Sequence, residues 1–188
     1  IIDYNKDGVE DILTSSSALG VAGITVYKGA YSNGNWSFTK QLDRGKEYLQ
    51  INSGGDLTNL YVAWDDIPAV TDVDSDGDVD ILVFEPGGST ITYFNNRSAE
   101  SGWGSDSLRY SIEDICWGKI LENQFNESVY LSDDPDMCSD GFTGGGEILP
   151  RHAGSTILAL DMDMDGDKDA LVGDISSRRL VYLHNGLT

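Results

Sequence analysis

The sequence predicts an all-β fold of short antiparallel strands, and three observations favour it. Glycine makes up 22 of the 188 residues, well above the ordinary share of about 7%, as expected for a chain rich in turns. Short apolar segments alternate with turns that carry glycine or serine, which is the pattern of strands. An acidic loop precedes three of these segments, at residues 3–11, 72–80 and 161–169. Strands and acidic loops therefore form a repeated unit.

The charge of the chain argues against two classes of partner. With 32 acidic and 12 basic residues, the formal net charge is −20, and such a surface repels the phosphates of nucleic acids and anionic membranes. No apolar run approaches the roughly 18 residues of a membrane span. Because 39% of the residues are hydrophobic, the chain can still form a packed core. We expect no nucleic-acid partner and no membrane insertion.

The three acidic loops share the pattern D-x-[DN]-x-D-G-x-x-D, followed by two apolar residues. Ca²⁺ takes about 6–8 oxygen ligands, and carboxylates at positions 1, 3 and 5 converge on one ion where a glycine at position 6 allows a sharp turn. Position 7 supplies a backbone carbonyl, and position 9 supplies another carboxylate. The predicted ligands of about three Ca²⁺ ions are Asp3, Asn5, Asp7, Val9 and Asp11, then Asp72, Asp74, Asp76, Asp78 and Asp80, and finally Asp161, Asp163, Asp165, Asp167 and Asp169.

The acidic loops are not EF-hands. That motif needs a bidentate Glu at position 12 and helices on both sides, whereas position 12 here is Thr14, Val83 or Val172 and the flanks are strand-like. Two alternatives stay open. The loops could be acidic surface turns without an ion, which the fixed pattern disfavours, or they could bind Ca²⁺ only to hold the fold together.

Each acidic loop is expected inside one unit of strand, loop, strand, turn and strand. Such a unit cannot bury both of its faces alone, so we expect the units to stack radially, as the blades of a propeller do. The whole chain, 1–188, is then one β-propeller region. Its repeat units cover about 1–60, 61–100 and 151–188, and an insertion covers about 97–150.

The repeats resemble the FG-GAP or VCBS family, the Ca²⁺-loop blades of integrin-α-type β-propellers. The resemblance covers roughly 1–30, 65–96 and 155–187. It implies a propeller of typically seven blades, with Ca²⁺ in a hairpin loop of each blade that carries the motif. Three motifs are too few to close such a ring, and the chain begins only two residues before Asp3. We therefore expect a partial propeller, or a fragment of a longer polypeptide.

A second resemblance concerns location. The segments 133–138 and 151–156, the third acidic loop at 161–169 and the segment 180–186 are similar to repeats in secreted Bacteroidota proteins, which are often exported by the type IX secretion system. This resemblance implies a secreted or cell-surface protein. The partners that it implies are other domains of the same polypeptide or the secretion machinery.

The insertion contains the two cysteines of the chain, Cys116 and Cys138. In an extracellular protein they most simply form a disulfide, and two buried thiols are the alternative. Leu108, Ile112, Ile115 and Ile120 are spaced as on one face of a helix, so the sequence predicts a short helix there. The alternative for the insertion is that it supplies extra strands or caps one face of the propeller.

Catalysis finds little support in the sequence. Most close carboxylate pairs are explained as Ca²⁺ ligands, and no G-x-S-x-G elbow accompanies Ser155 and His152. Asp133, Asp134 and Asp136 fit a turn better than an active site. We expect a non-catalytic module for adhesion to a protein or glycan, with Trp36, Trp64 and Trp103 as candidate sugar-stacking residues. The alternative is an accessory or catalytic domain of a secreted polysaccharide-degrading enzyme.

Overall fold

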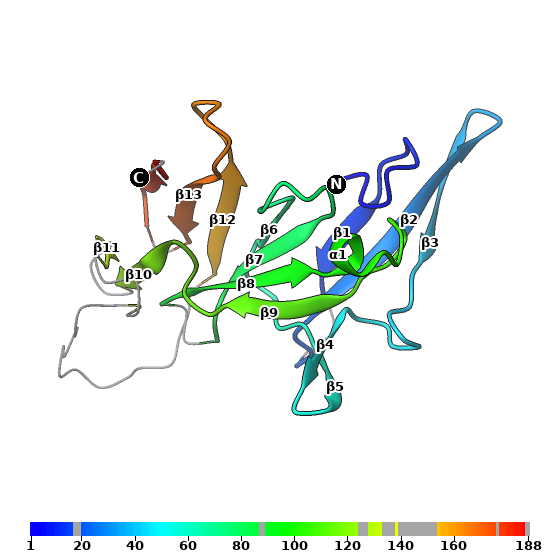
Figure 1. Ribbon diagram of the computed structural model, residues 1–188, viewed down its shortest axis with the longest axis horizontal. Coiled ribbons are helices and arrows are strands. Elements are labelled where there is room, and N and C mark those ends of the chain that lie inside the picture. Colours follow the sequence, from blue (N-terminus) through cyan, green and yellow to red (C-terminus); the bar gives the residue numbers. More distant parts are fainter. Residues whose placement is uncertain are drawn as a thin grey trace.

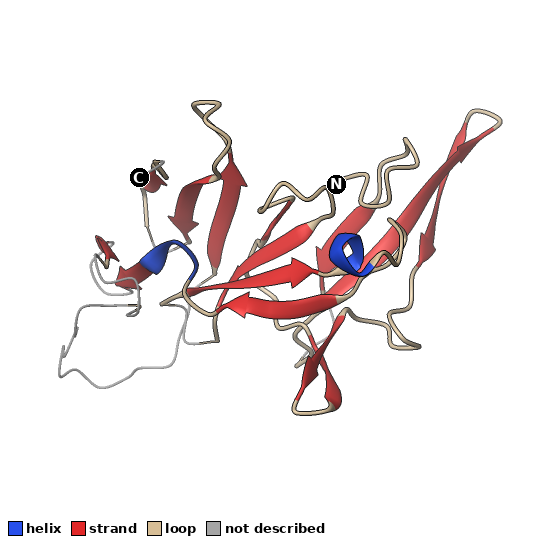
Figure 2. Ribbon diagram, in the orientation of Figure 1, coloured by secondary structure: helices blue, strands red, loops and turns tan. Residues whose placement is uncertain are grey.

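The computed structural model of the chain consists mainly of β-strands (Figure 2). It describes residues 1–16, 20–86, 89–123, 128–132, 138, 154–175 and 177–186. The acidic residues of segment 133–136 and the pair 151–152 lie outside the described residues. Neither helical segment in the described part of the chain has the length or apolar character that a membrane span requires.

The first sheet is antiparallel, in the order β1-β2-β3, and follows the first acidic loop. Its strands are β1 (Ile12–Ser15), β2 (Ile24–Ser32) and β3 (Asn35–Lys40). The turn between β2 and β3 is Asn33-Gly34, and both residues have positive φ angles of 51° and 80°. A two-residue hairpin turn with the right twist requires such angles, and Asn-Gly is the sequence that adopts them most readily.

The second sheet has six strands in the order β5-β4-β9-β8-β7-β6. All of its pairings are antiparallel except that of β4 with β9, which meet in parallel at Ile51 and Tyr110. The second acidic loop connects β6 to β7. The strands are β4 (Gln50–Ser53), β5 (Asp56–Asn59), β6 (Ala69–Thr71), β7 (Asp80–Phe84), β8 (Ile91–Asn96) and β9 (Tyr110–Asp114).

The third sheet is antiparallel, in the order β12-β13-β14, and the third acidic loop connects its first two strands. These strands are β12 (Ser155–Leu160), β13 (Asp169–Asp174) and β14 (Leu180–Leu183). A separate hairpin pairs β10 (Ile120–Asn123) with β11 (Ser128–Leu131). The helical segments are α1 (Ser98–Ser101) and the 3-10 turn η1 (Trp117–Lys119).

Strand β7 lies between two hydrophobic cores, because its side chains alternate between the faces of the second sheet. Ile81 and Val83 belong to the core shared with the first sheet. Leu82 and Phe84 belong to the core shared with the third sheet. The three sheets are therefore stacked face to face in chain order, and Figure 1 shows the second sheet between the other two. The described residues do not close into a ring of sheets.

The short helix predicted around Leu108–Ile120 is wrong. Strand β9 occupies residues 110–114 and pairs with β8, while Ile112 and Ile115 are exposed. Pairing with an existing sheet edge satisfies the backbone here and overrides a weak helical spacing. The insertion therefore adds a fourth antiparallel strand to the second unit, β6-β7-β8-β9, and that unit extends beyond residue 100.

Candidate metal centres

The three acidic loops begin with the same hydrogen bond. A carboxylate oxygen of the first aspartate accepts the N–H of the glycine at position 6, over 2.8 Å in the first loop and 3.1 Å in the other two. These glycines have φ angles of 86°, 99° and 102°, which residues with a Cβ rarely adopt. The pairs are Asp3–Gly8, Asp72–Gly77 and Asp161–Gly166. The loops thus curl around their first carboxylate, as the motif predicts.

Position 7 of each loop also has a fixed hydrogen bond. Its backbone N–H donates to the carboxylate at position 5, over 3.0 Å, 2.9 Å and 3.0 Å in chain order. The pairs are Val9–Asp7, Asp78–Asp76 and Asp167–Asp165. This bond uses one oxygen of the position-5 carboxylate. In the first loop the other oxygen contacts Lys28 and Asn5, whereas Asp76 and Asp165 lie next to other carboxylates.

The final aspartate of each loop attaches the loop to its sheet. Asp11, Asp80 and Asp169 are at most 1% exposed. One oxygen of each accepts the N–H of loop position 2. The other accepts a backbone N–H from within β2 in the first unit, from the last residue of β8 in the second and from just after β14 in the third. The donors are Tyr4 and Gly29, Val73 and Asn96, and Met162 and Asn185, at 2.7–3.1 Å. These residues are structural anchors as well as predicted ligands.

Carboxylates converge in the second and third loops. Oxygen atoms of Asp72, Asp74 and Asp80 lie within 4.8 Å of one another, as do those of Asp161, Asp163 and Asp165. Two further groups extend these clusters: Asp74 and Asp76 with Glu100, and Asp163 and Asp169 with His184. Among the described residues, no such group includes a residue of the first loop.

The donor set of the second loop fits a hard divalent cation. Buried oxygens of Asp72, which belongs to this cluster, and of Asn95, whose amide contacts Asp74, have no hydrogen-bond partner in the described structure. Buried polar atoms normally have one, so each of these oxygens needs a counterpart. Carboxylate and amide oxygens are the ligands that Ca²⁺ prefers. The residues present would therefore supply an all-oxygen site for such an ion.

Burial shifts the pKa values of the loop carboxylates. Desolvation raises the pKa of Asp80 to about 7 and that of Asp78 to about 6. Desolvation also raises the pKa of Asp11. For Asp169 burial acts in the same direction, but hydrogen bonds from Asn185, Met162, Tyr182 and His184 outweigh it and lower the pKa. A nearby cation would favour the charged form of all of these groups.

One position in each unit that faces the acidic loop was not predicted from the sequence. The residue just before the N–H that donates to the final aspartate faces the acidic loop. It is Lys28 in the first unit, Asn95 in the second and His184 in the third. The Lys28 ammonium lies 3.5 Å from Asp7 Oδ2, the Asn95 amide donates to Asp74 Oδ2 at 2.8 Å, and His184 Nε2 lies 3.7 Å from Asp163 Oδ2. Aligning the sequences of β2, β8 and β14 on the residue that donates to the final aspartate could have revealed this position.

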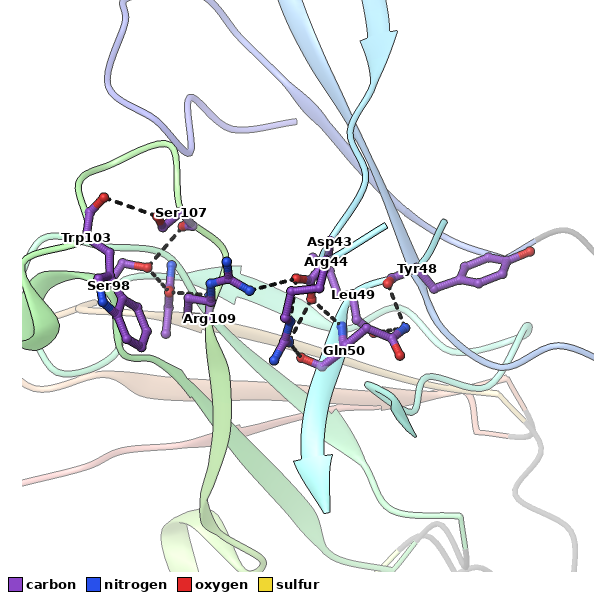
Figure 3. Close-up of polar contacts among 10 residues, drawn as sticks. Asp43, Arg44, Tyr48, Leu49, Gln50, Ser98, Trp103, Ser107 and Arg109 are labelled. Atoms are coloured by element: carbon purple, nitrogen blue, oxygen red, sulfur yellow. Dashed lines mark hydrogen bonds and ion pairs between the residues drawn. The ribbon is translucent and has the colours of Figure 1, made fainter. Parts of the chain in front are cut away.

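A second polar cluster, centred on Asp43, was not predicted. Figure 3 shows this carboxylate between Arg44 and Arg109. Arg44 donates to it through Nε at 2.8 Å and Nη2 at 2.9 Å, and the Gln50 N–H donates at 2.6 Å. The guanidinium of Arg109 also lies 5.9 Å from the centre of the Trp103 ring. The carboxylate is fully paired and joins the start of β4 to β9, so its role is structural.

The insertion carries a disulfide. Cys116 and Cys138 are bonded to each other, with their Cα atoms 5.6 Å apart. Cys116 directly precedes η1, and 22 positions separate the two residues in sequence. The bond closes the loop that contains the β10–β11 hairpin.

Aromatic side chains are exposed on the β2–β3 hairpin. Tyr31, Trp36 and Phe38 are 56%, 55% and 45% exposed. Trp36 stacks on Phe38 with 6.2 Å between ring centres and 8° between the planes, and Tyr31 lies 5.1 Å from Trp36. We call these three residues the aromatic strip. Trp64 and Trp103, also singled out from the sequence, are exposed as well, but neither belongs to this strip.

Comparisons with protein-family models, with curated proteins and with solved structures find no match for this chain. The resemblance to FG-GAP or VCBS repeats therefore rests on the loops themselves. Their shared hydrogen bonds and their place between antiparallel strands are the observations that bear on it.

Proposed function

We propose that this chain is a calcium-stabilised β-propeller module, displayed outside the cell, that binds a glycan without changing it chemically. The second acidic loop carries this proposal, because it combines converging carboxylates with buried oxygens that have no partner. Extracellular Ca²⁺ is close to millimolar, so even sites with dissociation constants of about 10⁻⁴–10⁻³ M are occupied there.

The stacking of the sheets supports the propeller part of the proposal. The middle sheet is covered on both faces, as a blade is by its two neighbours. Figure 1 places the loops between β6 and β7 and between β12 and β13 on the same side as the N-terminal loop. Equivalent loops of neighbouring blades share one side of a propeller. We place the three sheets as neighbouring blades of a larger ring.

The disulfide supports an extracellular location. Disulfides persist in oxidising compartments and are rare in the cytosol. The bond between Cys116 and Cys138 is therefore in keeping with a secreted or surface-displayed protein. Export by the type IX system would bring the chain to the same place.

The aromatic strip is the proposed ligand-binding surface. Exposed, nearly parallel rings such as those of Trp36 and Phe38 offer flat apolar faces beside polar groups, which suits the C–H faces of sugar rings. The negative charge of the chain favours a neutral glycan over an acidic one. Among the described residues, every group of three or more carboxylate or histidine side chains that could hold a metal includes residues of the acidic loops.

Glycan-array binding tests this function. We expect the wild-type chain in Ca²⁺ to bind neutral glycans, Trp36→Ala to bind at least tenfold more weakly, and Trp64→Ala, an exposed tryptophan outside the strip, to bind as the wild type does. Release of reducing ends from a bound glycan would indicate the polysaccharide-degrading alternative. If no glycan on the array binds, and the wild type captures a surface protein that Trp36→Ala does not, the ligand is a protein and not a glycan.

A further inference from the structure

The three units place chemically different side chains at one equivalent position. The N–H groups of Gly29, Asn96 and Asn185 all donate to the final aspartate of their loop, at 2.7–2.8 Å. This hydrogen bond aligns the units independently of the loop sequences. The residue before it is a lysine in the first unit, an asparagine in the second and a histidine in the third, and each faces a loop carboxylate.

In the first loop, protein donors already occupy the position-5 carboxylate. Asp7 Oδ2 lies 3.5 Å from the ammonium of Lys28 and 3.1 Å from Asn5 Nδ2, while Asp7 Oδ1 accepts the Val9 N–H. Within the described structure, no side chain donates to the corresponding second oxygens of Asp76 and Asp165. The first loop thus uses both oxygens of a carboxylate that the other loops leave accessible.

A second carboxylate holds the lysine in place. Asp106, from the segment before β9, accepts Lys28 Nζ at 2.7 Å and Asn5 Nδ2 at 3.0 Å. The ammonium and the amide therefore bridge Asp106 to Asp7. Asn5 is 4% exposed, and an aspartate in its place would put a third carboxylate at this bridge. Position 3 is an asparagine in this loop and an aspartate in the other two. Its uncharged amide keeps that third carboxylate away from the Lys28 bridge.

The second loop has the opposite arrangement. Asn95 is uncharged and 3% exposed; its Nδ2 donates to Asp74 and to the Tyr93 hydroxyl, and its Oδ1 is buried without a partner. The carboxylates of this loop converge. The ammonium of Lys6 lies beside Gly77, where a Cβ would touch it, but among the described residues no lysine or arginine forms an ion pair with the carboxylates of this loop. Converging carboxylates without an ion pair favour an external cation in this loop, whereas in the first loop Lys28 already pairs with Asp7.

We propose that Lys28 is the built-in cation of the first loop. Its ammonium, fixed by Asp106, neutralises Asp7 and takes the place of a divalent ion, so that the chain binds Ca²⁺ in the second and third loops only. A Ca²⁺ ion in the first loop would lie close to a fixed positive charge, and the two would repel each other. This inference rests on the proposed calcium-binding function and reduces its ion count from three to two.

Isothermal titration with CaCl₂, at pH 8 on chelator-treated protein, tests the proposal. We expect two ions per wild-type chain and three for Lys28→Asn, which places the asparagine of the second unit in the first. Lys40→Asn is the matched control, because it removes the same charge from an exposed pair with Glu47 and should leave two ions. Circular dichroism verifies that each variant is folded.

The reverse substitution keeps the proposal testable if Lys28→Asn folds poorly. Asn95→Lys should lower the count from two to one. Three ions in the wild type, or two in a folded Lys28→Asn variant, would overturn the role of Lys28 while leaving calcium binding intact. No bound ion in the wild type would overturn the proposed calcium function itself.

Discussion

The aspartates of each acidic loop have two separate roles. Asp80 is fully buried and accepts hydrogen bonds from Val73, Asn96 and Tyr93. Asp76 is exposed, and within the described structure it accepts a hydrogen bond from the Asp78 N–H only. The first residue joins the loop to the sheet, and the second serves mainly as a ligand.

Substitutions compared in excess chelator, where no Ca²⁺ is bound, distinguish these two roles. In chelator, Asp76→Ala should unfold at nearly the wild-type temperature, whereas Asp80→Ala should lose on the order of 3–5 kcal/mol, because three donors are left without an acceptor. In Ca²⁺ both variants should be less stable than the wild type. Thermal unfolding in the two buffers measures this. Equal losses for the two variants in chelator would contradict the division of roles.

The raised pKa of Asp80 predicts a pH dependence in chelator. Its pKa rises from 3.8 to about 7 on folding, and that of Asp78 rises from 3.8 to about 6. Between these values the folded chain binds more protons than the unfolded chain, so the free energy of unfolding falls as the pH rises from about 4 to about 7. Urea unfolding at pH 5 and pH 7.5 should show this fall. Asp80→Asn should make the free energy of unfolding depend less on pH. An equally steep fall in that variant would exclude Asp80 as the source of the pH dependence.

At the scale of elements, the sequence predicts the strands that follow the acidic loops well. Strands β7 and β13 begin at Asp80 and Asp169 and continue through the apolar residues after them, because a run that is buried on both faces leaves little choice of structure. The region around Ile112 was predicted as a helix, because its partner, the edge of β8, lies outside the local sequence. Long-range pairing of this kind leaves no local signal.

Gly29 tests how closely the first loop packs on β2. A Cβ at this position would overlap the carbonyl oxygen of Glu10, and the Gly29 N–H anchors Asp11. Gly29→Ala should therefore cost about 2 kcal/mol or more, as overpacking against backbone does. Gly186→Ala, where a Cβ would make only an ordinary contact with His184, is the control. Similar unfolding midpoints for both variants in urea would contradict this packing.

At the scale of the whole molecule, the loops are predictable from sequence, whereas the long-range contacts that distinguish them are not. The spacing of Asp3, Asp72 and Asp161 identifies three equivalent loops. The bridge from Lys28 to Asp106 joins residues 78 positions apart, so no local sequence pattern predicts it. The order in which the sheets stack likewise follows from side chains on both faces of β7, which only the fold displays.

The disulfide should stabilise the insertion against unfolding. Cross-linking two residues 22 positions apart restricts the unfolded chain and contributes about 3 kcal/mol by loop entropy. Cys116→Ser with Cys138→Ser should lower the unfolding midpoint in urea accordingly. A reducing agent should produce the same loss in the wild type and no change in the double variant. An unchanged wild-type midpoint after reduction would show that the bond adds no stability.

Thermal unfolding in 5 mM CaCl₂ and in excess EGTA tests the central claim, that divalent ions hold the acidic loops and stabilise the stacked sheets. For dissociation constants of about 10⁻⁴–10⁻³ M, each ion adds about 1–2 kcal/mol. Two ions should therefore raise the midpoint by about 5–15 °C, and MgCl₂ at the same concentration should raise it less, because Mg²⁺ demands a stricter geometry. Identical midpoints in CaCl₂ and EGTA would contradict the claim.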